Sequence, residues 1–189
     1  MSPKDLSTLP DNLPIPIDDG ACDHLLNAQL PSISLKNTSG TQINLSELKG
    51  TVVLFFYPLN GKPSSPAMVG WNDIPGARGC TPQVCSYKDN YLTLSGLDVT
   101  VYGVSSQPLL DQKEAKERLG LPYTLLNDTK LELTNALHLP TFEYKSLVCI
   151  KRLTIIVIDG KIKKIFYPVF PPDKNVNDVI EWLTQTNTA

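Results

Sequence analysis

The sequence lacks several features that would point to common classes of partner. Its 17 basic and 19 acidic side chains give a formal net charge of -2 and form no basic block, so no nucleic-acid partner is expected. No apolar run reaches the ~20 residues needed to cross a bilayer, which argues against a membrane partner. Residues 1–20 also contain no apolar signal-peptide core. We therefore expect a cytoplasmic protein.

The usual metal-binding and nucleotide-binding patterns are missing as well. The two histidines, His24 and His138, stand far apart, no CxxC pair occurs among the four cysteines, and no glycine-rich phosphate loop is present. A zinc site, a CxxC disulfide reductase and a nucleotide enzyme therefore lack their characteristic residues. We expect neither a metal nor a cofactor.

The length and composition indicate one catalytic domain. A chain of 189 residues, 41% hydrophobic and 19% charged, can bury one substantial core, because domains usually span ~100–200 residues. Residues 1–19 are rich in Pro, Asp and Ser without any periodicity, which predicts an extended or disordered N-terminal arm. Residues 20–189 then form the folded domain.

Strand and helix patterns alternate along that domain. The expected strands are a hairpin turning at 38–40, buried runs at 51–58 and 98–106, a short strand or turn at 123–128, and a hairpin at 153–169. The expected helices cover 81–97, 108–120, 129–139 and 175–185. This order predicts the α/β class with a thioredoxin-like fold, in which a central mixed sheet is flanked by helices on both faces.

Cys80 and Cys85 are the cysteines closest in sequence, and a helix begins beside them. Thr81 can cap the free backbone N–H groups, and Pro82 suits a first-turn position that needs no donor. A helix N-terminus stabilises a thiolate and can lower a cysteine pKa from ~8.5 towards ~3.5–7.5. With Thr81 as the cap, Cys80 and Cys85 occupy the two positions that touch in a hydrophobic staple.

Other readings of this cysteine pair stay open. If the helix begins before Cys80, the sulfurs lie about 140° apart around the axis with ~7.5 Å of rise between them. A disulfide needs Cα atoms ~4.4–6.8 Å apart, so it would then require the first turn to unwind. Both cysteines could equally be small buried hydrophobes. An iron–sulfur site is a weaker reading, because the matching CxxC is missing.

The segment GCTPQVCSYKDNY at 79–91 resembles the GCTxxxCxFRD segment of the peroxiredoxin-Q group, also called bacterioferritin comigratory proteins. Further segments follow in the order of that family over residues 20–183, namely FFYP, GVSS, LGLPYTLLND, KRLTIIVIDGKI and FPPDKNVNDVIEWL. The resemblance implies a thioredoxin-like fold and a thiol peroxidase that reduces hydrogen peroxide and organic hydroperoxides.

The resemblance also implies roles for the two cysteines. Cys80 matches the peroxidatic cysteine, which becomes a sulfenic acid, and Cys85 matches the resolving cysteine, which forms a disulfide with it. A second thiol protein must then reduce that disulfide. The family implies thioredoxin or a similar dithiol reductant as the partner, and a monomer or homodimer.

Arg152 heads the Arg-x-Thr pattern that carries the active-site arginine of the family. The resemblance implies that its guanidinium keeps Cys80 ionised and donates hydrogen bonds to the departing oxygen. Without the resemblance, an arginine at a strand end is more often an ordinary surface residue. The expected substrate pocket consists of Tyr57, Pro58, Gly79 and Thr81, although Tyr57 is equally compatible with the core.

The sequence differs from the family pattern in the residues that precede Cys80. Peroxiredoxins usually carry PxxxTxxC, whose threonine binds peroxide, but Ala77 occupies that position here. An insertion at about 61–76 separates the two halves of the pattern, so a replacement hydroxyl must come from Ser64, Ser65, a more distant side chain or the backbone. Trp71, in the insertion, is expected as a pocket wall, an interface residue or a hydrophobic anchor.

The remaining cysteines and the histidines receive no role. Cys22 and Cys149 match no catalytic cysteine of the family and are expected to be packing residues. Because Ala77 replaces the threonine, the rival hypothesis is a non-enzymatic redox-sensing or binding module with the same fold.

Overall fold

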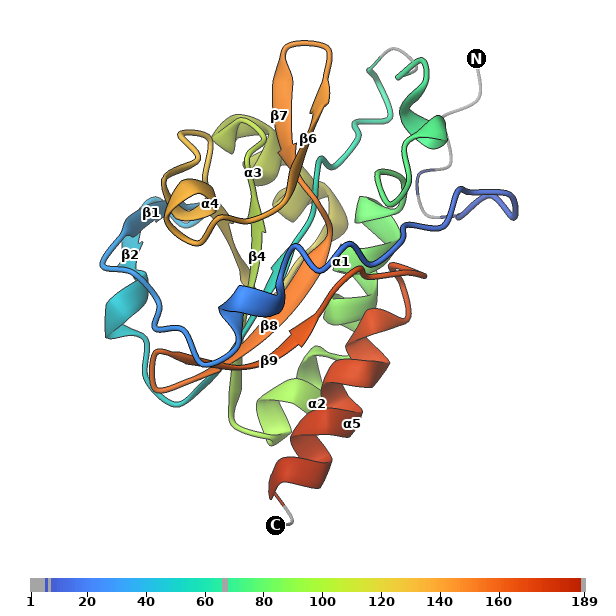
Figure 1. The fold of residues 1–189 in the computed structure, drawn as a ribbon. Helices are drawn as coiled ribbons and strands as arrows, with labels where there is room; N and C mark the ends of the chain where they lie inside the picture. Colours follow the sequence, from blue (N-terminus) through green and yellow to red (C-terminus); the bar gives the residue numbers. More distant parts are fainter. Residues whose placement is uncertain (1–5, 7, 66–67, 188–189) are drawn as a thin grey trace.

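The structure is a computed structural model that describes residues 6, 8–65 and 68–187, with a seven-stranded sheet at its centre (Figure 1). Its strands are β1 (Ser34–Asn37), β2 (Gln42–Asn44), β3 (Thr51–Phe56), β4 (Val99–Ser105), β5 (Thr124–Asn127), β8 (Leu153–Ile158) and β9 (Lys161–Phe166). They lie in the order β2-β1-β5-β4-β3-β8-β9. The β5-β4-β3 part is parallel and the other pairs are antiparallel. The predicted α/β class with a mixed sheet is confirmed.

Strand β3 lies inside the sheet, between β4 and β8, and nearly all of its side chains are apolar and buried, as a strand covered on both faces requires. It pairs in parallel with β4 on one side and antiparallel with β8 on the other, so that Phe56 faces both Val104 and Leu153. The carboxyl end of β3 therefore lies beside the beginning of β8. Tyr57 and Pro58 follow β3, and the chain then enters the long loop at 59–79.

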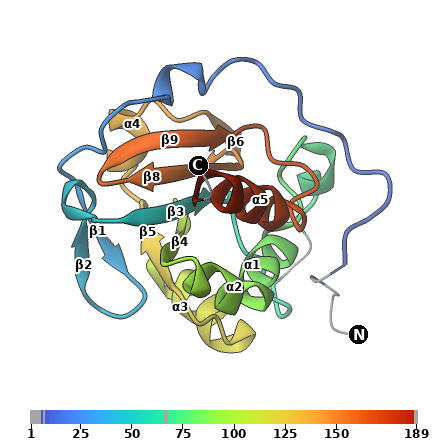
Figure 2. The same ribbon diagram turned by 90° about the horizontal axis from the view of Figure 1, so that it is seen from below.

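Helices cover both faces of the sheet, as predicted (Figure 2). They are α1 (Cys80–Asp89), α2 (Tyr91–Gly96), α3 (Leu109–Leu119), α4 (Glu132–Ala136) and α5 (Asn175–Asn187). Alternate residues of β3 point to opposite faces: Phe55 packs with the α1 and α5 side, whereas Leu54 packs with the α4 side. Among the described residues, no helix is long and apolar enough to cross a membrane.

Three short 3-10 helices and a second sheet complete the described structure. The 3-10 helices are η1 (Asp23–Leu25), η2 (Leu45–Glu47) and η3 (Trp71–Asp73). The second sheet is a hairpin of β6 (Thr141–Tyr144) and β7 (Leu147–Ile150), which sequence analysis did not predict. Its strands are only four residues long, and Lys145 at the turn takes a positive φ of 54° in place of the glycine or asparagine that signals a hairpin.

The helix predicted at 81–97 is two helices, α1 and α2. The break falls at Asn90, whose side-chain amide donates to the carbonyl oxygen of Ser86 at 2.9 Å. Asparagine side chains compete in this way for backbone groups and so interrupt helices. The predicted hairpins and buried strands are all present.

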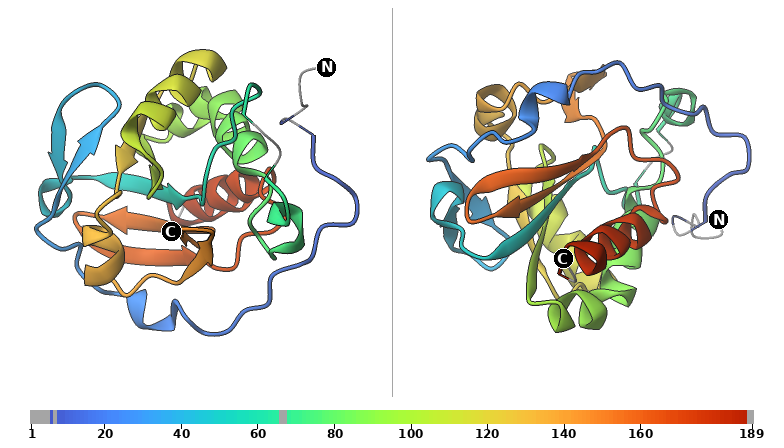
Figure 3. Two further views of the ribbon diagram at one scale, coloured as in Figure 1. Left: turned by 90° about the horizontal axis from the view of Figure 1, so that it is seen from above. Right: turned by 60° about the horizontal axis from the view of Figure 1, so that its bottom comes forward.

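Residues 8–19 contain no helix or strand and run beside the loop that leads to α1 (Figure 3). Residues 1–5 and 7 of the predicted N-terminal arm lie outside the described residues, as do residues 66–67 of the insertion. The division of the chain at residues 19 and 20 stays a prediction.

Candidate active site

Helix α1 begins at Cys80, one residue earlier than the sequence predicts. Gly79 is its N-cap, with a positive φ of 110° that few residues other than glycine adopt, and its carbonyl oxygen accepts the first helical hydrogen bond from Gln83 at 3.0 Å. The prediction that Thr81 caps the helix is therefore wrong, because the left-handed glycine turns the chain sooner. Thr81 is instead buried in the first turn, and Cys80 lies at the positive end of the helix.

The Cys80 thiol is enclosed by three polar groups from three parts of the chain. The Nη2 atom of Arg152 donates to its Sγ atom at 3.2 Å, and the backbone N–H of Leu59 donates at 3.5 Å. The thiol itself donates to the carbonyl oxygen of Ala77 at 3.7 Å. Only 4% of the Cys80 residue surface is exposed. Two hydrogen-bond donors therefore face the sulfur in a nearly closed site.

Arg152 is buried, which excludes the reading of an ordinary surface residue. Its guanidinium donates to the side-chain oxygen of Gln83, to the carbonyl oxygen of Ala77 at 3.2 Å and to that of Arg78 at 3.3 Å. These acceptors lie in α1 and in the loop before it. The arginine is thus oriented by the same segment that carries Cys80.

Cys85 lies half-buried on α1, and its pKa is raised by burial. All four cysteines are free thiols. Because α1 already includes Cys80, the two sulfurs lie about 140° apart around the helix axis with ~7.5 Å of rise between them. The predicted staple contact between Cys80 and Cys85 is therefore wrong, since it depended on Thr81 as the cap.

The other predicted pocket residues surround the end of β3. Tyr57 belongs to the same apolar cluster as Cys80, and its hydroxyl accepts from the side chain of Gln112 at 3.4 Å. Burial raises the pKa of Tyr57. Pro58 is buried, and its carbonyl oxygen accepts from Ser105 at 2.9 Å. These contacts fix the segment from which Leu59 reaches the thiol.

Ala77 occupies the position of the family's threonine and is fully buried. It contributes its carbonyl oxygen, which accepts from both Cys80 and Arg152. Ser64 and Ser65, which the sequence offered as replacement hydroxyls, are exposed. The additional donor on the sulfur is the backbone N–H of Leu59.

The inserted loop is anchored on the β6–β7 hairpin through Trp71. The Trp71 ring lies 5.0 Å from the Tyr144 ring and 5.7 Å from the Phe142 ring, measured between centroids. Trp71, Tyr144, Ala77 and Cys149 form one buried apolar cluster. Of the three readings of Trp71, the structure therefore favours a hydrophobic anchor, which holds Ala77 at the thiol.

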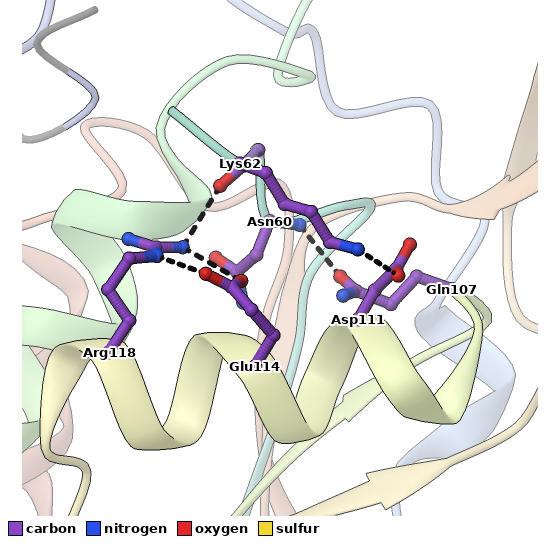
Figure 4. Close-up of polar contacts among 7 residues, drawn as sticks. Asn60, Lys62, Gln107, Asp111, Glu114 and Arg118 are labelled. Carbon is purple, nitrogen blue, oxygen red and sulfur yellow. Dashed lines mark hydrogen bonds and ion pairs between the residues drawn. The ribbon is translucent and has the colours of Figure 1, made fainter. Parts of the chain in front are cut away.

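Polar contacts hold the first part of the loop against α3 (Figure 4). The backbone N–H of Asn60 donates to the side chain of Gln107 at 2.7 Å, and Lys62 pairs with Asp111 at 2.5 Å. Arg118 donates to the carbonyl oxygen of Gly61 at 3.1 Å. Both side-chain amide atoms of Asn60 and the Nε2 atom of Gln107 are buried and find no hydrogen-bond partner among the described residues.

Cys22 and Cys149 are buried, as expected of packing residues. Burial raises the pKa of Cys22 to about 12 and that of Cys149 to about 11. The His24 and His138 rings approach to 6.3 Å between centroids, and His24 Nε2 lies 2.8 Å from the Leu137 carbonyl oxygen. The part of the chain that the structure describes contains no cluster of three or more His, Cys, Asp or Glu residues that could hold a metal.

Sequence analysis missed Gln83 and Leu59. Gln83 follows Cys80 by three positions, and this spacing places the two on one helix face, which could have identified it. Leu59 acts through its backbone N–H, which no side-chain pattern reveals.

Known proteins resemble this chain over most of its length. Residues 26–180 match the Redoxin family. The chloroplastic peroxiredoxin Q of Suaeda salsa is 26% identical over 154 residues, covering 81% of this chain and 64% of that protein. Peroxiredoxin bcp1 of Schizosaccharomyces pombe is 31% identical over 137 residues, covering 68% of this chain and 63% of that protein. The matched segment thus spans less than two thirds of these relatives.

Two solved structures share the fold. Peroxidoxin BcpB from Mycobacterium tuberculosis superposes with a TM-score of 0.67 at 22% identity, covering 85% of this chain and 96% of that one. Xanthomonas campestris peroxiredoxin Q superposes with a TM-score of 0.65 at 17% identity, covering 92% of this chain and 97% of that one. The predicted thioredoxin-like fold is confirmed.

Proposed function

Because this chain belongs to the Redoxin family, as a peroxiredoxin of the peroxiredoxin-Q type, we propose that it is a thiol peroxidase in which Cys80 reduces hydroperoxides. The observation that carries the proposal is the contact between Arg152 and Cys80 Sγ at 3.2 Å, at the start of α1. A fixed cation and a helix N-terminus both favour the thiolate, which is the nucleophilic form of cysteine.

The first step is attack of the Cys80 thiolate on the terminal oxygen of a hydroperoxide. An S–O bond forms, the O–O bond breaks, and the departing oxygen takes a proton to leave as water or an alcohol. Cys80 is oxidised to a sulfenic acid. Arg152 donates hydrogen bonds to the oxygens as charge develops on them, and the N–H of Leu59 holds the sulfur in place.

The second step joins Cys80 to Cys85. The Cys85 thiol displaces the hydroxyl of the sulfenic acid, so that a disulfide forms and water leaves. Because both sulfurs lie on α1, the first turn of that helix must unwind before they can meet. Thioredoxin or a similar dithiol protein then reduces the disulfide by exchange.

A coupled assay tests the proposal by following the loss of hydrogen peroxide with thioredoxin as the reductant. Cys80→Ser is expected to abolish turnover, whereas Cys22→Ala, which removes a buried thiol from the opposite apolar cluster, is expected to retain it. A wild-type protein that reacts with peroxide no faster than free cysteine would support the rival module without enzymatic activity.

A further inference from the structure

A segment at the N-terminus, residues 8–19, crosses the candidate active site, and we call it the strap. Near its start, the carbonyl oxygen of Thr8 accepts from the Arg78 guanidinium at 3.3 Å. At its end, Asp19 pairs with Lys151 at 3.0 Å and accepts from the Tyr167 hydroxyl at 2.8 Å. Arg78 and Lys151 are chain neighbours of Gly79 and Arg152, so both ends of the strap are tied beside the reacting groups.

The strap also packs closely on the loop that delivers Cys80. A Cβ atom added to Gly79 would lie 2.9 Å from Leu9, and one added to Gly76 would lie 3.6 Å from Pro16. Glycine at position 79 therefore lets the strap approach the loop backbone, whereas a Cβ atom at position 76 would make an ordinary van der Waals contact with Pro16. The blue strap and the green loop run side by side in both views of Figure 3.

Between the strap and the body of the protein lies a cavity of about 360 Å³. Pockets for small organic molecules usually measure ~300–1,000 Å³ and are mostly apolar. The strap contributes Ile15, Pro16 and Ile17 to its lining, and the inserted loop contributes Ile74, Pro75 and Gly76. The rest comes from the sheet side and the chain after β9, namely Phe142, Lys151, Arg152, Tyr167, Pro168 and Val169.

This cavity adjoins the thiol through two of its lining residues. Arg152 contacts Cys80 Sγ, and Gly76 immediately precedes Ala77, whose carbonyl oxygen accepts from that thiol. Cys80 itself is not among the lining residues, so Arg152 is the side chain that the cavity and the sulfur share.

The chemistry of the lining selects an uncharged hydrocarbon group. The Lys151 ammonium is paired with Asp19, and the two Nη atoms of Arg152 are engaged by Gln83, Ala77 and the thiol. The buried Nε atom of Arg152 has no hydrogen-bond partner among the described residues. Ile15 and Ile17 line the cavity but are 69% and 84% exposed, so most of their apolar surface is not covered in the structure. They gain apolar contact when the cavity is filled.

We propose that this cavity binds the hydrocarbon group of an uncharged organic hydroperoxide, and that Ile15 and Ile17 of the strap make the protein favour such substrates over hydrogen peroxide. This inference rests on the proposed peroxidase function. The strap residues act by binding the part of the substrate that does not react, which raises kcat/KM for apolar hydroperoxides only.

The test compares an Ile15→Ser/Ile17→Ser double variant with the wild type and with Leu92→Ser. Leu92 is 86% exposed on α2 and serves as the matched control. Stopped-flow measurements give the rate constant for oxidation of the reduced protein by hydrogen peroxide and by cumene hydroperoxide. Binding of cumyl alcohol, the unreactive product, is measured separately by NMR on the reduced protein.

For the double variant, we expect the cumene hydroperoxide rate to fall about tenfold with the hydrogen peroxide rate unchanged, because two large apolar contacts are lost. Cumyl alcohol should shift resonances of the strap in the wild type only. Equal losses with both substrates, or no loss with either, would overturn the inference. If the wild type reduces neither substrate, the proposed function fails, and the cumyl alcohol spectra alone then decide whether the cavity binds the hydrocarbon group.

Discussion

The Nη2 atom of Arg152 lies 3.2 Å from the Sγ atom of Cys80, although the two residues stand 72 positions apart in the chain. Pairing of β3 with β8 explains this proximity. The register sets Phe56 opposite Leu153, so the end of β3 and the start of β8 coincide. Arg152 immediately precedes β8, while the loop after β3 leads into α1, and the sheet therefore brings both residues to the same edge.

Arg152→Lys should lower the rate of Cys80 oxidation by hydrogen peroxide by about 10²–10³, the usual effect of losing one donor that faces developing charge. Lysine keeps the charge but cannot reproduce the fork that reaches Gln83, Ala77 and the sulfur together. Stopped-flow kinetics measure the rate. Lys163→Ala, which removes an exposed cation from β9, is the control. A lysine variant as fast as the wild type would mean that charge alone is sufficient.

Gln83 is predicted to be a positioning residue that acts through Arg152. Gln83→Ala leaves a buried guanidinium N–H without its acceptor, so we expect the peroxide rate to fall about tenfold. Gln83→Glu keeps an acceptor oxygen at the same place and should restore most of that rate. The peroxide rates of the two variants are compared at temperatures where both are equally folded, so that a loss of positioning is distinguished from a loss of stability. Equal defects in both would assign Gln83 a packing role instead.

Gly79→Ala should destabilise the protein because this position needs a positive φ and has no room for a methyl group. Its Cβ atom would lie 2.3 Å from Pro172 and 2.9 Å from Leu9. The left-handed conformation alone costs an L-residue roughly 1–2 kcal/mol, and the contact adds to it. Gly96→Ala is the matched control, because nothing lies within 4 Å of its added Cβ atom. In a helix, that change should stabilise by up to about 1 kcal/mol. Urea unfolding measures the stability of both variants. Similar urea midpoints for Gly79→Ala and Gly96→Ala would refute the steric argument.

Much of the fold could be predicted because the central strands and their turns have characteristic residue patterns. The run at 51–58 is apolar on both faces, and Asp159-Gly160 marks the β8–β9 turn. The cap of α1 is predicted two residues too late, at Thr81, because Thr81-Pro82 is a typical helix start, whereas Gly79 turns the chain first. The β6–β7 hairpin has no such turn signal, since Lys145 takes the positive φ.

The candidate site was predictable only where side chains carry the chemistry. Cys80 and Arg152 follow from a resemblance, and the structure brings them together. The contributions of Leu59 and Ala77 are backbone groups, whose identity does not depend on the side chain. The cavity under the strap could not be predicted from the sequence either, because the contacts of residues 8–19 with the loop and with Lys151 join segments that are far apart in the chain.

Disulfide formation between Cys80 and Cys85 should become faster as the pH rises. Burial raises the pKa of Cys85, so little of its reactive thiolate is present at neutral pH. Below that pKa the thiolate fraction grows tenfold per pH unit, and we expect the rate of disulfide formation to rise about as steeply between about pH 6 and about pH 8.

Acid quenching after one equivalent of peroxide, followed by mass spectrometry, counts the sulfenic acid and the disulfide separately. Cys85→Ser should accumulate the sulfenic acid at every pH, whereas Cys149→Ala should behave as the wild type. Hydrogen exchange of the Gln83 amide, which donates the first helical hydrogen bond to Gly79, should increase in the disulfide form, because the first turn of α1 must unwind to bring the sulfurs together. A rate of disulfide formation that does not change with pH would contradict the prediction. It would show that unwinding of the first turn, and not ionisation of the Cys85 thiol, limits the reaction.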